Sequence, residues 1–193
     1  DAWGRAVHKA YFTQNTAPIA FDLLTRRFGT GWESCVRTVR AGAGRPPTSI
    51  GHLARSVSVE ERTRLQEAWA QMRDTHEVFG LLDRFRLARL QALRLLGPKW
   101  AKRARGDALW NLLVNVAAGS VPVMIFVGNK AVIQIYKGRI ERPVRTGPWW
   151  NVLDGRWNLH VDSRSLGETW IVRKPIPEGV VTSVEVFDRQ EQL

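Results

Sequence analysis

The sequence predicts an α+β fold in which an antiparallel β-sheet packs against several α-helices. Apolar residues recur every three or four positions in the middle of the chain, which is the spacing of amphipathic helices. After Ser120 the pattern changes to short β-prone segments separated by short turns. Short turns join antiparallel neighbours, because a parallel crossover needs a dozen or more residues. The C-terminal strands are therefore expected to form most of the sheet, with the middle helices packed on it.

The first part of the chain is expected to contain two strands and one helix. Residues alternate between two faces over Arg5–Phe12, which predicts a strand. Thr16 and Gly29 are placed as the start and end signals of a helix, and Ser34–Arg40 has the composition of a second short strand. Residues 41–57 begin with Gly and Pro and are expected to form a loop or linker within a single domain over residues 1–193.

Three helices are predicted in the middle of the chain. Ser58 and Glu61 have the spacing of a capping box, which marks the start of the first helix. The second is expected at about Ala88–Leu96, before a Gly-Pro pair, and the third begins with Asp107 as its N-cap. One continuous apolar face is predicted for the first helix, formed by Leu65, Trp69, Met72, His76 and Phe79.

Six segments after Ser120 have strand character. Asp154–Gly155 is a strong hairpin signal between two of them, and Gly128–Asn129 is a second turn signal. The six predicted strands are Val121–Val127, Val132–Tyr136, Trp149–Leu153, Trp157–Val161, Thr169–Arg173 and Val180–Phe187.

Composition and charge narrow the class of protein. The chain has 193 residues, of which 44% are hydrophobic, and this content excludes a mostly disordered polypeptide. Its net charge of +11 comes mostly from Arg and attracts anions such as nucleic acid, anionic lipid or an acidic small molecule. No apolar run approaches the roughly 20 residues of a membrane helix. A single Cys and no visible signal peptide favour the cytoplasm.

Common catalytic motifs are absent, and a histidine near the amino terminus is the main candidate ligand. The sequence has no P-loop, no G-x-G-x-x-G and no H-E-x-x-H pattern. His8 shares a predicted strand face with Ala6, Ala10 and Phe12, which leaves room for a flat apolar cofactor that carries a metal. The residues alone favour the alternative, an interior His bonded to backbone. The other histidines are expected in the core (His76), in sheet packing (His160) and in solvent (His52).

A basic group follows the predicted strand that ends at Tyr136. Arg139, Arg142 and Arg145 recur every three residues, and two readings of them remain open. They form either a clamp for carboxylates, helped by the Tyr136 hydroxyl, or a solvated turn. Most of the Trp residues fit strand or helix patterns and are expected in the core rather than stacked on nucleic-acid bases.

Seven segments together, in their order and spacing, resemble the second half of the bacterial haem-utilisation proteins of the HemS/ChuS/HmuS type, also called hemin-degrading factors. The most specific are GPWWNVLDGRWNLHV (147–161) and WIVRKP (170–175), the latter followed by GVVTSVEVFD (179–188). The others are AVHKAYF (6–12), DTHEVFGLL (74–82), LARLQALRLLG (87–97), PVMIFVGN (122–129) and IQIYKGR (133–139).

The resemblance implies one repeat of a two-repeat fold and a cytoplasmic protein that receives imported haem b. It implies that His8 is the axial ligand of the haem iron and that Gln134, Tyr136 and Arg139 face the haem. Some members of that family open the haem ring with oxygen and a reductant, whereas others hand haem to a separate haem oxygenase. A haem-import permease and a haem oxygenase are therefore the expected partners.

The first half of such proteins, which supplies an Arg on the distal side of the haem, has no counterpart in this chain. The chain is expected to be part of a longer two-repeat protein or to pair with itself or with another protein. The predicted function is haem binding in bacterial haem uptake and iron acquisition, either to carry haem to its oxidative degradation or to carry out that degradation. A basic nucleic-acid-binding module is the alternative, and it predicts binding that weakens steeply with salt.

Overall fold

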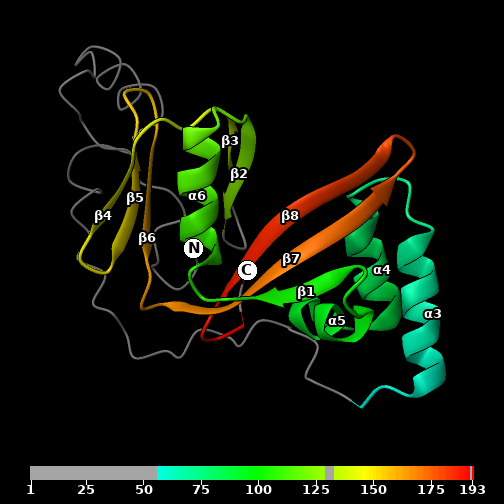
Figure 1. Ribbon diagram of the computed structural model, residues 1–193. Helices are drawn as coiled ribbons and strands as arrows, with labels where there is room; N and C mark the ends of the chain where they lie inside the picture. The colour runs from blue at the N-terminus through cyan, green and yellow to red at the C-terminus, as the bar shows by residue number, and fades with distance from the viewer. Residues whose placement is uncertain (1–55, 129–132, 192) are drawn as a thin grey trace, which may run out of the picture. The chain divides into compact units, whose positions relative to one another are not determined.

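A computed structural model describes residues 56–128, 133–191 and 193 of the chain (Figure 1). The predicted strands and helix before residue 50, most of the predicted linker and His8 lie outside these residues. In the described part, three helices come first and eight strands follow, with a fourth helix between the first two strands, and the predicted α+β class is confirmed. The described residues through Phe126 and from Ile135 onward belong to one compact unit.

A group of three helices opens the described chain: α3 (Val59–Ala70), α4 (Glu77–Phe85) and α5 (Arg89–Leu96). The predicted cap of α3 is confirmed, because the amide of Glu61 donates to the Ser58 hydroxyl at 3.2 Å. The predicted end of α5 is also confirmed. Gly97 follows it with a φ of 77°, a conformation that glycine adopts without the steric cost of a Cβ.

The prediction of one helix face extending to Phe79 is wrong. The chain turns after α3, where Asp74 accepts hydrogen bonds from the His76 backbone amide at 2.7 Å and from its Nδ1 at 2.6 Å. Such local side-chain bonds compete with helical pairing. His76 is therefore exposed rather than a core histidine, and Phe79 is 61% exposed. The new helix α4 buries its own apolar face of Val78, Leu81 and Phe85.

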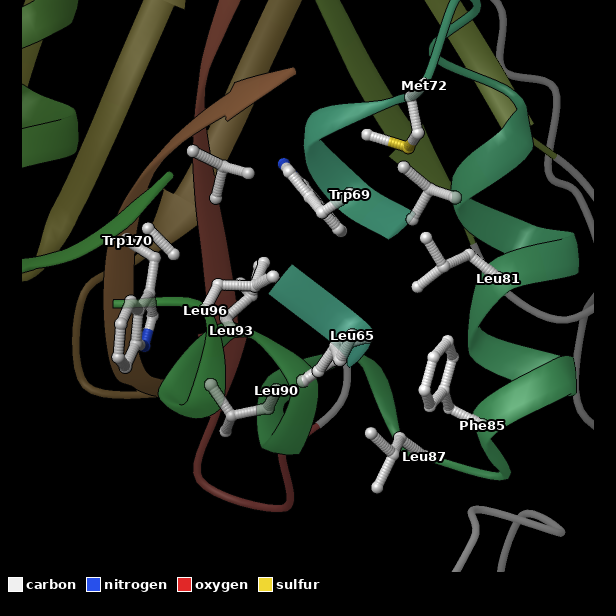
Figure 2. Close-up of a cluster of buried hydrophobic side chains, with 14 of the residues drawn as sticks. Leu65, Trp69, Met72, Leu81, Phe85, Leu87, Leu90, Leu93, Leu96 and Trp170 are labelled. Carbon is white, nitrogen blue, oxygen red and sulfur yellow. The ribbon is translucent and has the colours of Figure 1, made fainter. Parts of the chain in front are cut away.

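The three helices share one hydrophobic core with a three-stranded antiparallel sheet. The sheet has the order β1 (Ala101–Ala104), β7 (Leu166–Ile176), β8 (Gly179–Asp188). Figure 2 shows side chains from all three helices gathered in this core, among them Trp69 of α3. The Trp69 indole is 1% exposed, and its Nε1 donates to the carbonyl of Arg173 on β7 at 2.9 Å. This bond joins residues 104 positions apart in the chain.

An ion cluster buried beside this core links α5 to the β7–β8 hairpin. Glu185 of β8 is 6% exposed and receives two hydrogen bonds from Arg89 of α5, at 2.7 and 2.8 Å. Lys174 of β7 donates to the same carboxylate at 2.7 Å. Burial alone raises the pKa of Glu185, but the bonds and charges of Arg89 and Lys174 outweigh it and lower the pKa from 4.5 to about 2. The carboxylate is therefore ionised at all moderate pH values.

The remaining elements form a second core around α6 (Ala108–Ala118). This helix packs against an antiparallel sheet of β4 (Pro143–Thr146), β5 (Trp149–Leu153) and β6 (Asn158–Asp162). The predicted hairpin at Asp154–Gly155 joins β5 to β6 and is confirmed, since Asp154 and Trp157 exchange backbone hydrogen bonds. Two further strands, β2 (Val123–Gly128) and β3 (Ile133–Gly138), pair with each other.

Two details of this region differ from the sequence predictions. Asp107 precedes α6 but makes no side-chain cap bond, because its ψ of 1° departs from the extended backbone that an N-cap requires. The described strands also form three small sheets, two of which contain the short strands β1 and β4 that the sequence pattern did not predict. Within the described ranges, no helix combines the length and the apolarity needed to cross a bilayer.

Candidate functional site

Tyr136 is fixed in place at the end of β3. Its ring stacks on the indole of Trp157, with centroids 4.2 Å apart and planes 13° from parallel. Its hydroxyl donates to the backbone carbonyl of Arg139 at 2.6 Å. The phenol proton is therefore engaged within the protein, and the hydroxyl oxygen can still accept a bond from a ligand. The sequence predicted the Tyr136 hydroxyl as a hydrogen-bond donor, but only the folded structure shows that its partner is the backbone carbonyl of Arg139.

Gly138 makes this arrangement of Tyr136 possible. A Cβ at position 138 would lie 2.7 Å from the Tyr136 hydroxyl oxygen, which is closer than real Cβ contacts allow. The close approach explains why glycine stands between Tyr136 and Arg139.

The variant Gly138→Ala is expected to displace the Tyr136 hydroxyl and break its bond to Arg139. The loss of one hydrogen bond costs about 1–2 kcal/mol and lowers Tm by several degrees. Thermal unfolding and near-UV circular dichroism measure both the loss of stability and the change in the Tyr136–Trp157 stack. Gly155→Ala is the matched control, because a Cβ at position 155 has open space. Equal behaviour of the two variants would show that position 138 does not hold Tyr136.

The other predicted site residues of this segment are accessible from solvent. Gln134 lies on β3 and Arg139 follows the strand, and both side chains are exposed. The backbone of Arg139 is thus bound to the Tyr136 hydroxyl while the residue is exposed. His8, the predicted ligand, is outside the described residues, so its role stays a prediction.

Arg145 has a different environment from the one that the basic-clamp reading assumes. Its guanidinium lies 5.5 Å from the centroid of Trp110 and 5.3 Å from that of Trp150. Arg145 and Trp150 are opposite each other in the β4–β5 register, on the sheet face that α6 covers. Cation–π contacts of this kind hold the guanidinium against the sheet. Arg145 thus contacts the rings that pack α6 on the sheet while it remains exposed, and the carboxylate clamp of Arg139, Arg142 and Arg145 stays a prediction.

The sheet face opposite α6 carries a group of polar and aromatic side chains from β5 and β6. His160 of β6 is directly opposite Asn151 of β5, and its Nδ1 lies 2.7 Å from the Asn151 Oδ1. The sequence predicted that His160 packs within the sheet, but the structure shows that His160 is exposed. An open depression of about 460 Å³ lies at this position, lined by Thr146, Trp149, Asn151, Leu153 and His160.

Sequence reasoning missed this group because its members are brought together by strand register. Asn151 and His160 are nine positions apart, and their contact depends on which residues of β5 and β6 pair. Across the described ranges, no three His, Cys, Asp or Glu side chains gather in a way that would hold a bare metal ion.

Comparison with known sequences connects this geometry to one family. Residues 86–193 match the family model of the haemin-degrading HemS.ChuX domain. Over 187 residues the chain is 33% identical to the hemin transport protein HemS of Yersinia enterocolitica and 33% identical to the hemin transport protein HmuS of Yersinia pestis. Each alignment covers 97% of this chain and 52% of the relative.

Solved structures agree with the sequence comparison. The heme-binding protein PhuS of Pseudomonas aeruginosa, in its apo form, is similar with a TM-score of 0.77 and 34% identity, over 94% of this chain and 51% of PhuS. ChuS, described as a heme oxygenase of E. coli, is similar with a TM-score of 0.70 and 29% identity over 93% and 50%. The chain spans about half the length of these relatives, in line with the expectation that it corresponds to one repeat. It belongs to the family of the haemin-degrading HemS/ChuX domain.

Proposed function

We propose that this chain binds haem b through the imidazole of His8 and carries haem in bacterial haem utilisation. The observation that carries the proposal is the extent of the match to hemin transport and heme-binding proteins, which covers 94–97% of the chain. The segment that contains His8 lies within the part of the sequence that resembles these proteins. A neutral imidazole is a common axial ligand of haem iron.

The described residues fit a flat apolar group with anionic edges. The stacked rings of Tyr136 and Trp157 are partly buried against the second core, and the exposed Arg139 can pair with a carboxylate in a two-bond geometry. Gln134 is also exposed. In this proposal His8 binds the iron, Arg139 binds a propionate, and Tyr136 positions the backbone of Arg139. Haem, when bound by these residues, would supply a redox-active iron.

The proposal extends to the setting in which the protein works. We expect it to act in the cytoplasm, to receive haem from an import permease and to deliver it to a haem oxygenase. Because the chain spans about half of its relatives, the group on the distal side of the haem is expected from a further half or from a second copy. The competing form of the same proposal is that the protein opens the haem ring itself instead of delivering haem to an oxygenase.

Removal of the His8 imidazole is expected to weaken haem binding strongly. Haem is titrated into the purified chain up to one equivalent, and the shifted Soret band reports binding. His8→Ala is expected to weaken binding by at least about 100-fold, because outer-sphere partners alone account for roughly 10–100-fold in metal affinity. His76→Ala is the control, since His76 is exposed and bonded to Asp74.

Unchanged affinity and an unchanged Soret band in His8→Ala would disprove the ligand assignment. Ascorbate added to the loaded chain then separates the two forms of the proposal. A stable haem spectrum supports carriage, whereas loss of the spectrum in the presence of catalase supports oxidative degradation by the protein.

A further inference from the structure

Strand β2 has large apolar side chains on both of its faces. Val123 and Ile125 are partly buried and pack against the core around α6. Because successive residues of a strand point to opposite faces, Met124 and Phe126 project away from that core. These two residues are 53% and 59% exposed. A continuous apolar run of this kind is typical of a strand that is covered on both faces, so the side away from α6 is expected to have a partner.

Strand β3 continues this apolar side. Tyr136 packs against the same core, so Ile133 and Ile135 point to the opposite side of the paired strands. They are 61% and 59% exposed. The four residues Met124, Phe126, Ile133 and Ile135 are called the outer face of β2–β3 below. Single apolar residues are common on protein surfaces, whereas a group of neighbouring ones marks an interaction site.

The charge of the chain restricts which partner fits the outer face. Nucleic acids and acidic proteins are bound through Arg and Lys side chains, but the four residues of this face are uncharged. Lys137 lies on the same side only at the end of β3. An uncharged apolar face pairs best with another such face, and interfaces between identical chains are more apolar than most others. Two copies with a net charge of +11 repel each other least where they meet through uncharged residues.

The length of the relatives points to the same partner. The chain spans about half of HmuS and of PhuS, so this fold occurs there together with about as much protein again. A second copy of the chain supplies a surface of that size. Two copies related by a twofold axis present the same face to each other, which a face without charge allows.

We infer that the outer face of β2–β3 is the interface between two copies of this chain, packed face to face across a twofold axis. Phe126 is the expected anchor, because aromatic residues contribute most to such interfaces. The inference is independent of haem, since Gln134 and Tyr136 lie on the opposite side of β3. Because the contact is apolar and only the repulsion between like charges is screened, added salt is expected to strengthen the association.

Sedimentation velocity of the purified chain without haem, over a wide range of concentration, tests the inference. The wild-type chain is expected to form a dimer that dissociates on dilution. Phe126→Ala is expected to weaken dimerisation by about 30-fold or more, as loss of an aromatic anchor does. Ile135→Lys is expected to give a monomer, because it places like charges opposite each other. Phe79→Ala is the matched control, since Phe79 is 61% exposed on α4, and it is expected to keep the wild-type dimer.

Far-UV circular dichroism and thermal unfolding of dilute samples establish that each variant is folded. A wild-type chain that stays monomeric at its highest soluble concentration would overturn the inference. A dimer that persists in both Phe126→Ala and Ile135→Lys would also overturn it, because another surface would then hold the copies together.

Vesicles of phosphatidylcholine and phosphatidylglycerol test the other apolar partner, a lipid surface. Co-sedimentation of the monomeric chain with these vesicles, lost in Phe126→Ala, would assign the outer face to lipid instead of to a second copy. Since no haem is present in these experiments, none of their outcomes bears on His8, whose role is decided by the haem titration alone.

Discussion

Replacement of Glu185 by Gln is expected to lower the free energy of unfolding by about 3–5 kcal/mol. Glu185 is the shared partner of Arg89 and Lys174, and its carboxylate is buried. The amide of Gln keeps the shape but removes the charge, so both cations stay out of water without compensation. Equilibrium unfolding in urea, followed by tryptophan fluorescence, measures the change.

The Glu185 carboxylate also makes the free energy of unfolding decrease at acidic pH. Its pKa in the folded chain is about 2, compared with 4.5 for an unperturbed glutamate. A lowered pKa means that the stabilisation is present above about pH 5 and is lost as the pH falls toward 2. The difference corresponds to about 3 kcal/mol. Glu185→Gln is therefore expected to be less stable than the wild-type chain at pH 7, with the gap closing toward pH 2.

Glu178→Gln is the matched control, because Glu178 is exposed in the turn of the same β7–β8 hairpin. That change is expected to stay within about 0.5 kcal/mol, as surface substitutions do. Arg89→Lys keeps a positive charge but loses the paired geometry, and it is expected to lose less stability than Glu185→Gln. A loss below about 1 kcal/mol in Glu185→Gln would show that the ion cluster does not hold α5 to the hairpin.

Replacement of Trp69 by Ala is expected to cost about 3–5 kcal/mol of folding stability. The indole is buried where α3 packs against α5 and β7, so its removal leaves a cavity among side chains such as Leu65 and Leu93. The carbonyl of Arg173 also loses its side-chain donor. Urea unfolding gives the magnitude, and hydrogen exchange of α3 amides is expected to become faster because this helix depends on the contact.

Trp69→Phe separates packing from hydrogen bonding at this position. It retains an aromatic ring and removes the Nε1 donor, so it is expected to lose stability by a smaller amount than Trp69→Ala. Phe79→Ala is the control for loss of an aromatic side chain, because Phe79 is exposed. Comparable stability of Trp69→Ala and Phe79→Ala would contradict the placement of Trp69 in the core.

Local patterns predicted several elements of the fold correctly. The Ser58 cap, the Gly97 end and the Asp154–Gly155 hairpin depend on residues a few positions apart, and their physics is contained in short segments. The prediction that one helix face extends to Phe79 was wrong, because the apolar spacing of three and four residues continues across the turn between α3 and α4. Asp74 then decided the local structure through two hydrogen bonds that periodicity does not register.

Long-range pairing was beyond the reach of these patterns. The strand β1 has only four residues, two of them charged, and it exists because β7 lies beside it. Its formation depends on a partner more than 60 positions away, and a window of neighbouring residues holds no signal for that partner. The division of the described strands into three sheets also depends on which strands pair along the chain.

The sequence by itself determined the family and the candidate site residues His8, Gln134, Tyr136 and Arg139. The reason is that the family is recognised from the order and spacing of short segments, which can be compared without a structure. Only the tertiary structure shows that the Tyr136 hydroxyl donates to a backbone carbonyl and that the Nδ1 of His160 lies 2.7 Å from the Asn151 Oδ1. Hydrogen-bond partners and exposure are properties of atoms brought together across strands. The sequence therefore identifies the candidate residues, whereas the folded structure determines their hydrogen-bond partners and their exposure.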